Sequence, residues 1–157
     1  MATARARTTI RKARRSDIDE LTRIAHAAKR HWKYPEELLR LWKADLTVTA
    51  DAIATNPVYC AVRGDEIVGF YALSQSGGTC EIEHMWVTPD TIGSGVGRRL
   101  FAHLLRRLRA MKCTRLEIAS DPNAEGFYLR MGARRVGSVA SRPRGRRLPL
   151  LVVDIAP

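Results

Sequence analysis

The sequence predicts a mixed α/β fold: a mostly antiparallel sheet of six to seven strands, with a central βαβ unit and flanking helices. In residues 80–87 the residue types alternate with a period of two, which is typical of a strand. Glycines then recur at every second position, at Gly93, Gly95 and Gly97, and leucines at helical spacing follow them directly. Residues 115–119 form the next strand, and a helical crossover between two such strands favours parallel pairing.

The other elements follow from turn signals and hydrophobic periodicity on either side of this unit. Ahead of it we expect a strand over 8–13, helices from Ser16, from Pro35 and over 49–54, and a hairpin of strands 58–63 and 67–74. After it we expect a helix from Asn123 to a glycine cap at Gly132, and strands 134–140 and 148–155 joined by a basic loop, 141–147.

Length and composition indicate one domain. The chain has 157 residues, with 45% hydrophobic and 27% charged residues, which suits a globular protein with a proper core. No apolar run approaches the roughly 18 residues that a membrane span needs, so no membrane contact is expected. We expect a single domain over 1–157, of which 1–6 form a flexible arm without the apolar segment of a signal peptide.

The cysteines predict a reduced protein. Cys60, Cys80 and Cys113 are widely spaced and odd in number, and no C-x-x-C or zinc pattern occurs, so no metal is expected. Reduced thiols are the simplest interpretation, and they favour a cytoplasmic location. Cys80 and Cys113 are interpreted as buried small residues rather than nucleophiles.

The glycine loop predicts a binding site for an anion. Glycines let the backbone approach a phosphate, and the first turn of the helix supplies free N–H groups and a positive dipole end. Arg98 and Arg99 add two full charges. The nucleotide motifs G-x-x-x-x-G-K-[ST] and G-x-G-x-x-G do not fit this spacing, and a glycine-rich turn without a ligand remains the alternative.

Two stretches resemble the GCN5-related N-acetyltransferases. The first is Met85-Trp86-Val87-Thr88-Pro89 followed by Gly93-Ser94-Gly95-Val96-Gly97-Arg98-Arg99-Leu100. The second runs from Asn123 through Phe127 and Tyr128 to Gly132, which resembles the family's N-x-x-A-x-x-F-Y-x-x-x-G motif. The chain departs from the family at Ile92, where Arg or Gln is common, and at Ala124, which directly follows the asparagine.

The resemblance implies acetyl-CoA as co-substrate and direct transfer of its acetyl group to a primary amine of a small molecule or peptide. The residues implied in acetyl-CoA binding are Met85, Trp86, Val87, Ile92, Gly93, Ser94, Gly95, Val96, Gly97, Arg98, Arg99, Asn123, Phe127 and Tyr128. The backbone N–H of Val87 is expected to meet the thioester carbonyl. Homodimers are common in the family, so a homodimer is a further expectation.

Catalysis needs a general acid for the departing thiolate and a general base for the amine. Tyr128 is the predicted acid, because its pKa of about 10 is close to that of a thiol. Glu83, Glu81 and Glu117, in that order, are candidate bases, with ion pairs to arginines as the alternative role for each. Alternation places Glu81 and Glu83 on one face of their strand and His84 on the other.

Two other functions remain open from the sequence: a non-catalytic acyl-CoA-binding module and a basic nucleic-acid-binding domain. The second rests on the net charge of +11, from 27 Lys and Arg against 16 Asp and Glu. The arginines are scattered and aromatic content is 6%, so most are interpreted as solvated surface, and nucleic acid is not the expected partner. His31, Trp32, Tyr34 and Trp42 are candidates for acceptor contact, although core packing is preferred for both tryptophans.

Overall fold

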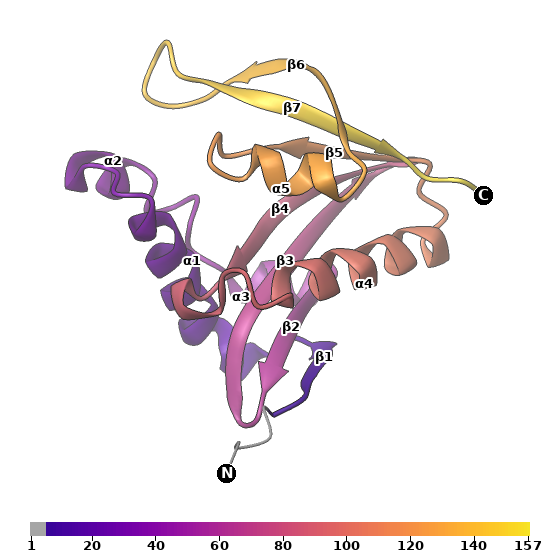
Figure 1. The fold of residues 1–157 in the computed structure, drawn as a ribbon, viewed down its shortest axis with the longest axis horizontal. Helices are drawn as coiled ribbons and strands as arrows, with labels where there is room; N and C mark the ends of the chain where they lie inside the picture. Colours follow the sequence, from indigo (N-terminus) through magenta and orange to yellow (C-terminus); the bar gives the residue numbers. More distant parts are fainter. Residues whose placement is uncertain (1–5) are drawn as a thin grey trace.

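In a computed structural model that describes residues 6–157, one seven-stranded sheet organises the chain, with strand order β1-β2-β3-β4-β5-β7-β6 (Figure 1). All neighbouring strands are antiparallel except β4 and β5, which are parallel. This confirms the predicted fold class; the expected arm at 1–6 lies, apart from Ala6, outside the described residues. The strands are β1 (Thr8–Lys12), β2 (Val58–Arg63), β3 (Glu66–Ser76), β4 (Thr79–Val87), β5 (Arg115–Ala119), β6 (Arg134–Ala140) and β7 (Arg147–Asp154).

Helices cover both faces of the sheet and enclose two hydrophobic cores. The helices are α1 (Ile18–His31), α2 (Glu36–Leu41), α3 (Ala50–Thr55), α4 (Val96–Ala110) and α5 (Glu125–Arg130), with short 3-10 turns η1 (Arg15–Asp17) and η2 (Pro89–Thr91). One core joins α4 and α5 to the sheet, and the other joins α1 and α2 to its opposite face. Within the described chain, no helix has the length and apolar character to cross a membrane.

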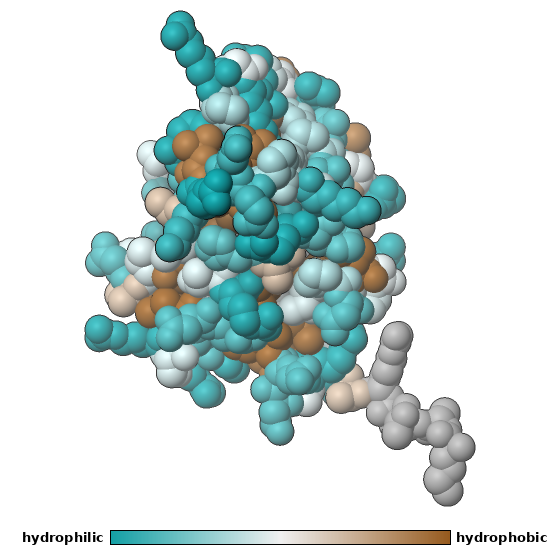
Figure 2. All heavy atoms as spheres, turned by 90° about the vertical axis from the view of Figure 1, so that its left-hand side faces the viewer, coloured by the Kyte–Doolittle hydropathy of each residue, from teal (hydrophilic) through white to brown (hydrophobic). Residues whose placement is uncertain are grey.

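Strand β3 explains why the sheet needs helices on both sides. Tyr71 and Leu73 belong to the α4 core, whereas Phe70 and Ala72 belong to the α1 core. Each of these side chains is buried, so alternate residues of the strand are shielded from water on opposite faces of the sheet. Seen from the side of α1 and α2, hydrophobic residues gather in patches between polar ones (Figure 2).

The central strands β4 and β5 pair over a short stretch and then part. Their parallel register covers Thr79–Glu81 opposite Arg115–Glu117. Beyond it, β4 continues to Val87 along β3, while β5 continues to Ala119 along β7. In the part of the chain that the structure describes, the later part of β4 therefore has no strand partner on its β5 side, and backbone groups there are left for another partner.

A bulge at Glu83 corrects the expected alternation of β4. Ala72 pairs with His84 and Leu73 pairs with Ile82, which leaves Glu83 as the extra residue. His84 therefore lies on the α1 face, together with Glu81, because their partners Ala72 and Ser74 are two residues apart on β3. The prediction that His84 projects to the opposite face from Glu81 is wrong, because the bulge inserts one residue into the period of two.

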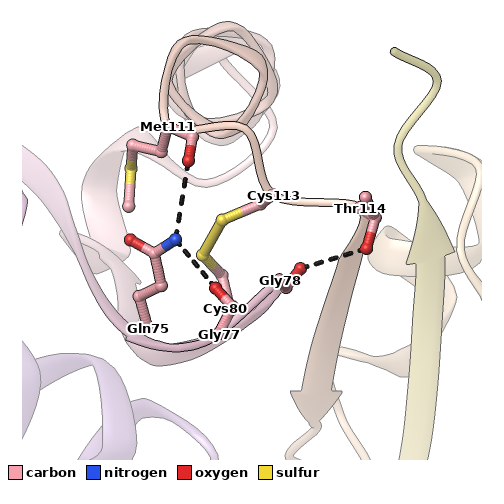
Figure 3. Close-up of a disulfide and its surroundings, with 7 residues drawn as sticks. All are labelled: Gln75, Gly77, Gly78, Cys80, Met111, Cys113 and Thr114. Atoms are coloured by element: carbon pink, nitrogen blue, oxygen red, sulfur yellow. Dashed lines mark hydrogen bonds between the residues drawn. A yellow bond between two sulfur atoms is a disulfide. The ribbon is translucent and has the colours of Figure 1, made fainter.

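A disulfide joins Cys80 at the start of β4 to Cys113 after α4 (Figure 3). Both cysteines are buried, as predicted, but the expectation that they are reduced thiols is wrong in this structure. The disulfide lies beside the paired end of β4 and β5, where the backbone N–H of Thr114 donates to the carbonyl of Gly78 over 2.8 Å. Cys60 is a buried free thiol, and burial raises its pKa to about 12.

Replacing Gly69 by alanine tests the close contact between β3, β4 and α4. A Cβ atom there would lie 2.8 Å from the carbonyl oxygen of Trp86 and 3.1 Å from side-chain atoms of Leu100 and Val87. Because the backbone oxygen cannot move without shifting β4, we expect Gly69→Ala to lower the free energy of unfolding by about 1–3 kcal/mol in urea denaturation. Gly137→Ala in β6 is the control, since nothing lies within 4 Å of its Cβ position. An equal loss in both variants would contradict this packing.

Candidate active site

A cavity of about 720 Å³ opens where β4 and β5 part. Its lining comes from the end of β4, the glycine loop before α4, the segment that contains α5, and the C-terminal end of α1. Gly97 and Phe127 contribute from the α4 side of the sheet, and Ala28 and Trp86 from the α1 side. The cavity thus connects the two faces of the sheet through the gap between the strands.

The glycine loop has the geometry of an anion site. Gly93 and Gly95 have φ values of 79° and 90°, in the left-handed region that favours glycine, and Gly95 caps α4. Thr91 lies buried beneath the loop, where its hydroxyl bonds to Thr88, and its carbonyl accepts a 2.5 Å hydrogen bond from the hydroxyl of Ser94. The first N–H groups of a 15-residue helix and the side chain of Arg98 therefore meet at the cavity.

Most residues that the sequence assigned to acetyl-CoA line this cavity. They are Met85, Trp86, Val87, Ile92, Gly93, Ser94, Gly95, Gly97, Arg98, Asn123, Phe127 and Tyr128. Val96 does not line it, because its side chain is buried in the α4 core. Arg99 does not line it either; it lies beside a second cavity on another side of α4. The roles of Val96 and Arg99 in acetyl-CoA binding stay predictions from the sequence.

Tyr128 presents a phenol to the cavity from a buried position. Its ring packs against Phe127 and Phe101, with centroid distances of 5.3 and 6.1 Å. Burial raises the pKa of Tyr128 well above its ordinary value, and the charge of Asp121 acts in the same direction. The phenol is therefore protonated at neutral pH. Tyr128 lines the cavity, so a bound molecule can reach the phenol.

A buried ion pair between Lys29 of α1 and Asp121, which follows β5, lies at the α1 side of the cavity. Nζ of Lys29 is 2.5 Å from Oδ2 of Asp121, and both side chains are less than a tenth exposed. Asp121 also accepts hydrogen bonds from Tyr34 Oη at 3.0 Å and from the backbone N–H of Asn123 at 2.8 Å. Burial alone would raise the pKa of Asp121, but the bonds from Lys29 and Asn123 outweigh it and hold that pKa below its usual value.

Sequence reasoning missed this pair. A signal was present, since Lys29 follows Ala25 by four residues and so falls on the apolar face of α1. A lysine in such a place is usually paired. Its partner is 92 positions away, and no local pattern names it.

Aromatic rings and the basic loop complete the surroundings of Lys29. Its ammonium lies 4.5 Å from the ring centroid of Trp42 and 4.8 Å from that of Tyr34. Arg146 also stacks on Trp42, at 4.5 Å, and the indole N–H of Trp42 donates to the carbonyl of Arg142. Two residues of the loop 141–147 therefore contact Trp42, directly after α2, although most of the loop is exposed.

The three candidate glutamates do not line the cavity. Glu81 and Glu117 are direct partners in the parallel register, so both lie on the α1 face beside the point where the strands part. Glu117 forms an ion pair with Arg115, and Glu83 accepts a 2.6 Å hydrogen bond from Ser74. Their common position is the face on which α1 lies, adjacent to the opening between β4 and β5.

Trp86 is oriented by His84. Its indole N–H donates to Nδ1 of His84 over 3.0 Å. Burial lowers the pKa of His84, which leaves the ring neutral and able to accept this bond at pH 7. The tryptophan thereby forms a fixed apolar wall on the α1 side of the cavity, while Trp32, 37% exposed, lies at its rim.

Comparison with known proteins decides the family. A sequence model of the acetyltransferase (GNAT) family matches residues 18–133, which is more than half of the chain. The chain belongs to the GNAT acetyltransferase family. It is therefore an N-acetyltransferase with acetyl-CoA as the acyl donor, which confirms the family and co-substrate expected from the sequence.

Its relatives span nearly the same length. The peptidyl-lysine N-acetyltransferase YjaB of Escherichia coli is 28% identical over 74% of this chain and 86% of its own. The PaiA N-acetyltransferase of Thermoplasma acidophilum, solved with coenzyme A, has a TM-score of 0.75 at 15% identity, over 94% of this chain and 99% of that one. A GCN5-related N-acetyltransferase of Rhodopseudomonas palustris has a TM-score of 0.77 at 19% identity, over 98% and 99%. Both solved structures share the fold of this chain.

The Lys29–Asp121 pair predicts a pH-dependent contribution to stability. Asp121→Asn leaves a buried ammonium without its counter-charge, so at pH 7 we expect the free energy of unfolding to fall by about 3 kcal/mol. The folded-state pKa of Asp121 is lowered, so the stabilisation is fully present above the unfolded pKa of about 4 and is lost as pH falls through the folded value. Urea denaturation at a series of pH values from 7 to 3 should show that the difference in the free energy of unfolding between wild type and variant becomes smaller as the pH falls.

Asp154→Asn is the matched control. Asp154 pairs with Arg134, and both side chains are more than half exposed. We expect its removal to change the free energy of unfolding by less than about 1 kcal/mol at every pH. A pH-independent difference for Asp121→Asn, or a loss no larger than that of the control, would show that Asp121 is not a buried carboxylate paired with Lys29.

Proposed function

We propose that the enzyme transfers the acetyl group of acetyl-CoA directly to a primary amine, and that a lysine side chain of a peptide is the first acceptor to test. The observation that carries the proposal is the cavity that connects both faces of the sheet. Such a cavity lets a donor on the α4 side and an acceptor on the α1 side meet at the gap between β4 and β5. The name of YjaB, a peptidyl-lysine N-acetyltransferase, supports this acceptor class.

The donor would be held mainly by backbone groups. The N–H groups from Gly93 to Gly97, with Arg98, suit the pyrophosphate of acetyl-CoA. The open edge of β4 would pair with the amide groups of the donor's pantetheine arm, because strand β5 has left it unpaired. In this arrangement the N–H of Val87 serves as the donor that polarises the thioester carbonyl.

The chemistry then proceeds in one displacement. The neutral amine attacks the thioester carbonyl, the C–N bond forms, and the C–S bond breaks. Tyr128 donates its proton to the departing thiolate. Burial raises the pKa of the phenol, so the phenol is protonated when the donor binds, but its pKa lies above that of a thiol and the close match expected from the sequence is lost. The proton lost by the amine passes through water to a carboxylate on the acceptor face; Glu83, Glu81 and Glu117 are the candidates, in that order.

The proposal includes three further properties. We propose that the chain acts as a single catalytic domain over 1–157. A homodimer is compatible with β1 and β6, the two edge strands, each of which has one side without a strand partner among the described residues. For the location, we propose the cytoplasm, as the sequence predicts.

Replacing Tyr128 by phenylalanine tests the general acid. The aromatic packing is retained and the proton is removed, so we expect kcat for thiol release with a lysine peptide to fall by about 100-fold or more. The KM for acetyl-CoA should change little, because the phenol acts on the leaving group. Tyr59→Phe is the matched control: its ring packs against Tyr71 outside the cavity, and kcat should be retained.

Two results would count against the proposal. Retained kcat in Tyr128→Phe would remove the tyrosine from the proton transfer. Acetyl-CoA binding without turnover of any amine by the wild-type protein would favour the alternative of a non-catalytic acyl-CoA-binding module.

A further inference from the structure

A second cavity, of about 390 Å³, lies between β1 and α4. Arg7 and Thr9 line it from the N-terminal side, and Arg99, His103 and Arg106 line it from α4. The three helical residues follow the spacing i, i+4, i+7, so they share one face of α4. The small side chain of Ala102 on the same side leaves room between them.

The charge of this cavity is uncompensated. Among residues 6–157, three guanidinium groups line it and no carboxylate does. Within the described part of the chain, Arg7, Arg99 and Arg106 form no ion pair, whereas eight other basic side chains do. Three like charges around one concave surface repel each other, and a bound anion would remove that repulsion.

The surrounding polar groups are fixed and add donors. Nδ1 of His103 is bonded to the hydroxyl of Tyr71 over 2.6 Å, and the ring packs 4.7 Å from that of Tyr59. Burial lowers the pKa of His103, and Arg106 and Arg107 act in the same direction, so the ring is neutral and its Nε2 is the nitrogen left for another partner. Arg63 adds a fourth guanidinium nearby, with its Nε donating to the hydroxyl of Thr8.

We propose that the cavity between β1 and α4 binds a small phosphate-bearing molecule, separate from acetyl-CoA. Arginine forks match phosphate oxygens in geometry and charge, and two of the three arginines come from a helix that holds them at fixed spacing. A concave site bounded by a strand and a helix suits a compact ligand. A single-stranded nucleic acid would instead favour an extended basic groove lined by aromatic rings.

The site is distinct from the acetyl-CoA cavity. The two share no lining residue, although both border α4: Gly97 and Arg98 face one and Arg99 faces the other. The proposal therefore does not depend on the acceptor or on the catalytic roles given above.

The test is calorimetric titration of pyrophosphate, and separately of ATP, into the protein saturated with CoA. We expect binding at one site, which weakens as salt is raised. Arg7→Gln combined with Arg106→Gln should weaken it by about tenfold or more, because two charge-assisted contacts are lost. The control combines Arg109→Gln with Arg144→Gln, two exposed arginines outside both cavities with the same loss of charge, and should stay within about twofold. Retained CoA affinity shows that each variant is folded.

Four outcomes would overturn the proposal. The first is that neither probe binds, and the second is that the control variant loses as much probe affinity as Arg7→Gln with Arg106→Gln. The third is probe binding that disappears once CoA is present. The fourth is binding of a short single-stranded oligonucleotide through Arg7 and Arg106 without binding of the small probes. The third, seen by comparing titrations with and without CoA, would place the probes in the acetyl-CoA cavity at the glycine loop, and the fourth would assign the cavity between β1 and α4 to nucleic acid.

Discussion

The short parallel contact between β4 and β5 is the constraint on which the site depends. Three residue pairs hold the strands together, and beyond Glu81 and Glu117 they separate. Strand β4 remains extended because β3 pairs with it along its whole length, from Thr79 to Val87. Unpaired backbone groups away from water are costly, so an open strand edge beside a cavity is where a ligand with its own amide groups gains most. The disulfide at Cys80 and Cys113 holds the closed end of the gap.

Each side of the gap has its own support. On the α4 side, left-handed glycines and the start of a long helix concentrate N–H groups without any buried charge. On the α1 side, the Lys29–Asp121 pair ties a helix to the segment after β5 and so fixes the approach to α5 and Tyr128. Burying the two charges of the pair costs desolvation, so we interpret the pair as a contact that positions these two segments rather than as a source of net stability. The aromatic rings of Tyr34 and Trp42 reduce that cost for the ammonium.

The sequence predicted local structure well and long-range pairing poorly. The bounds of β2, β5 and β6 match the prediction, because turn residues limit each strand. The bulge at Glu83 could not be foreseen, since Glu81, Ile82 and Glu83 alternate regularly and the interruption appears only in the pairing with β3. The motifs located the cavity, but they did not show that Arg98 and Arg99 face different cavities. Consecutive residues of a helix are rotated by about 100°, so Arg98 lines the acetyl-CoA cavity and Arg99 lines the second one. The Lys29–Asp121 ion pair and the Cys80–Cys113 disulfide each join residues that are far apart in the sequence, so no local pattern could predict them.

Amide hydrogen exchange with and without CoA tests the central claim most directly. That claim is that acetyl-CoA binds through the backbone of the glycine loop and the open edge of β4. The account predicts slower exchange on CoA binding in residues 85–98, with little change in β6 and β7, which lie outside the cavity. Protection elsewhere, with residues 85–98 unchanged in an enzyme that turns over acetyl-CoA, would contradict the account, because the donor would then be held by another part of the chain.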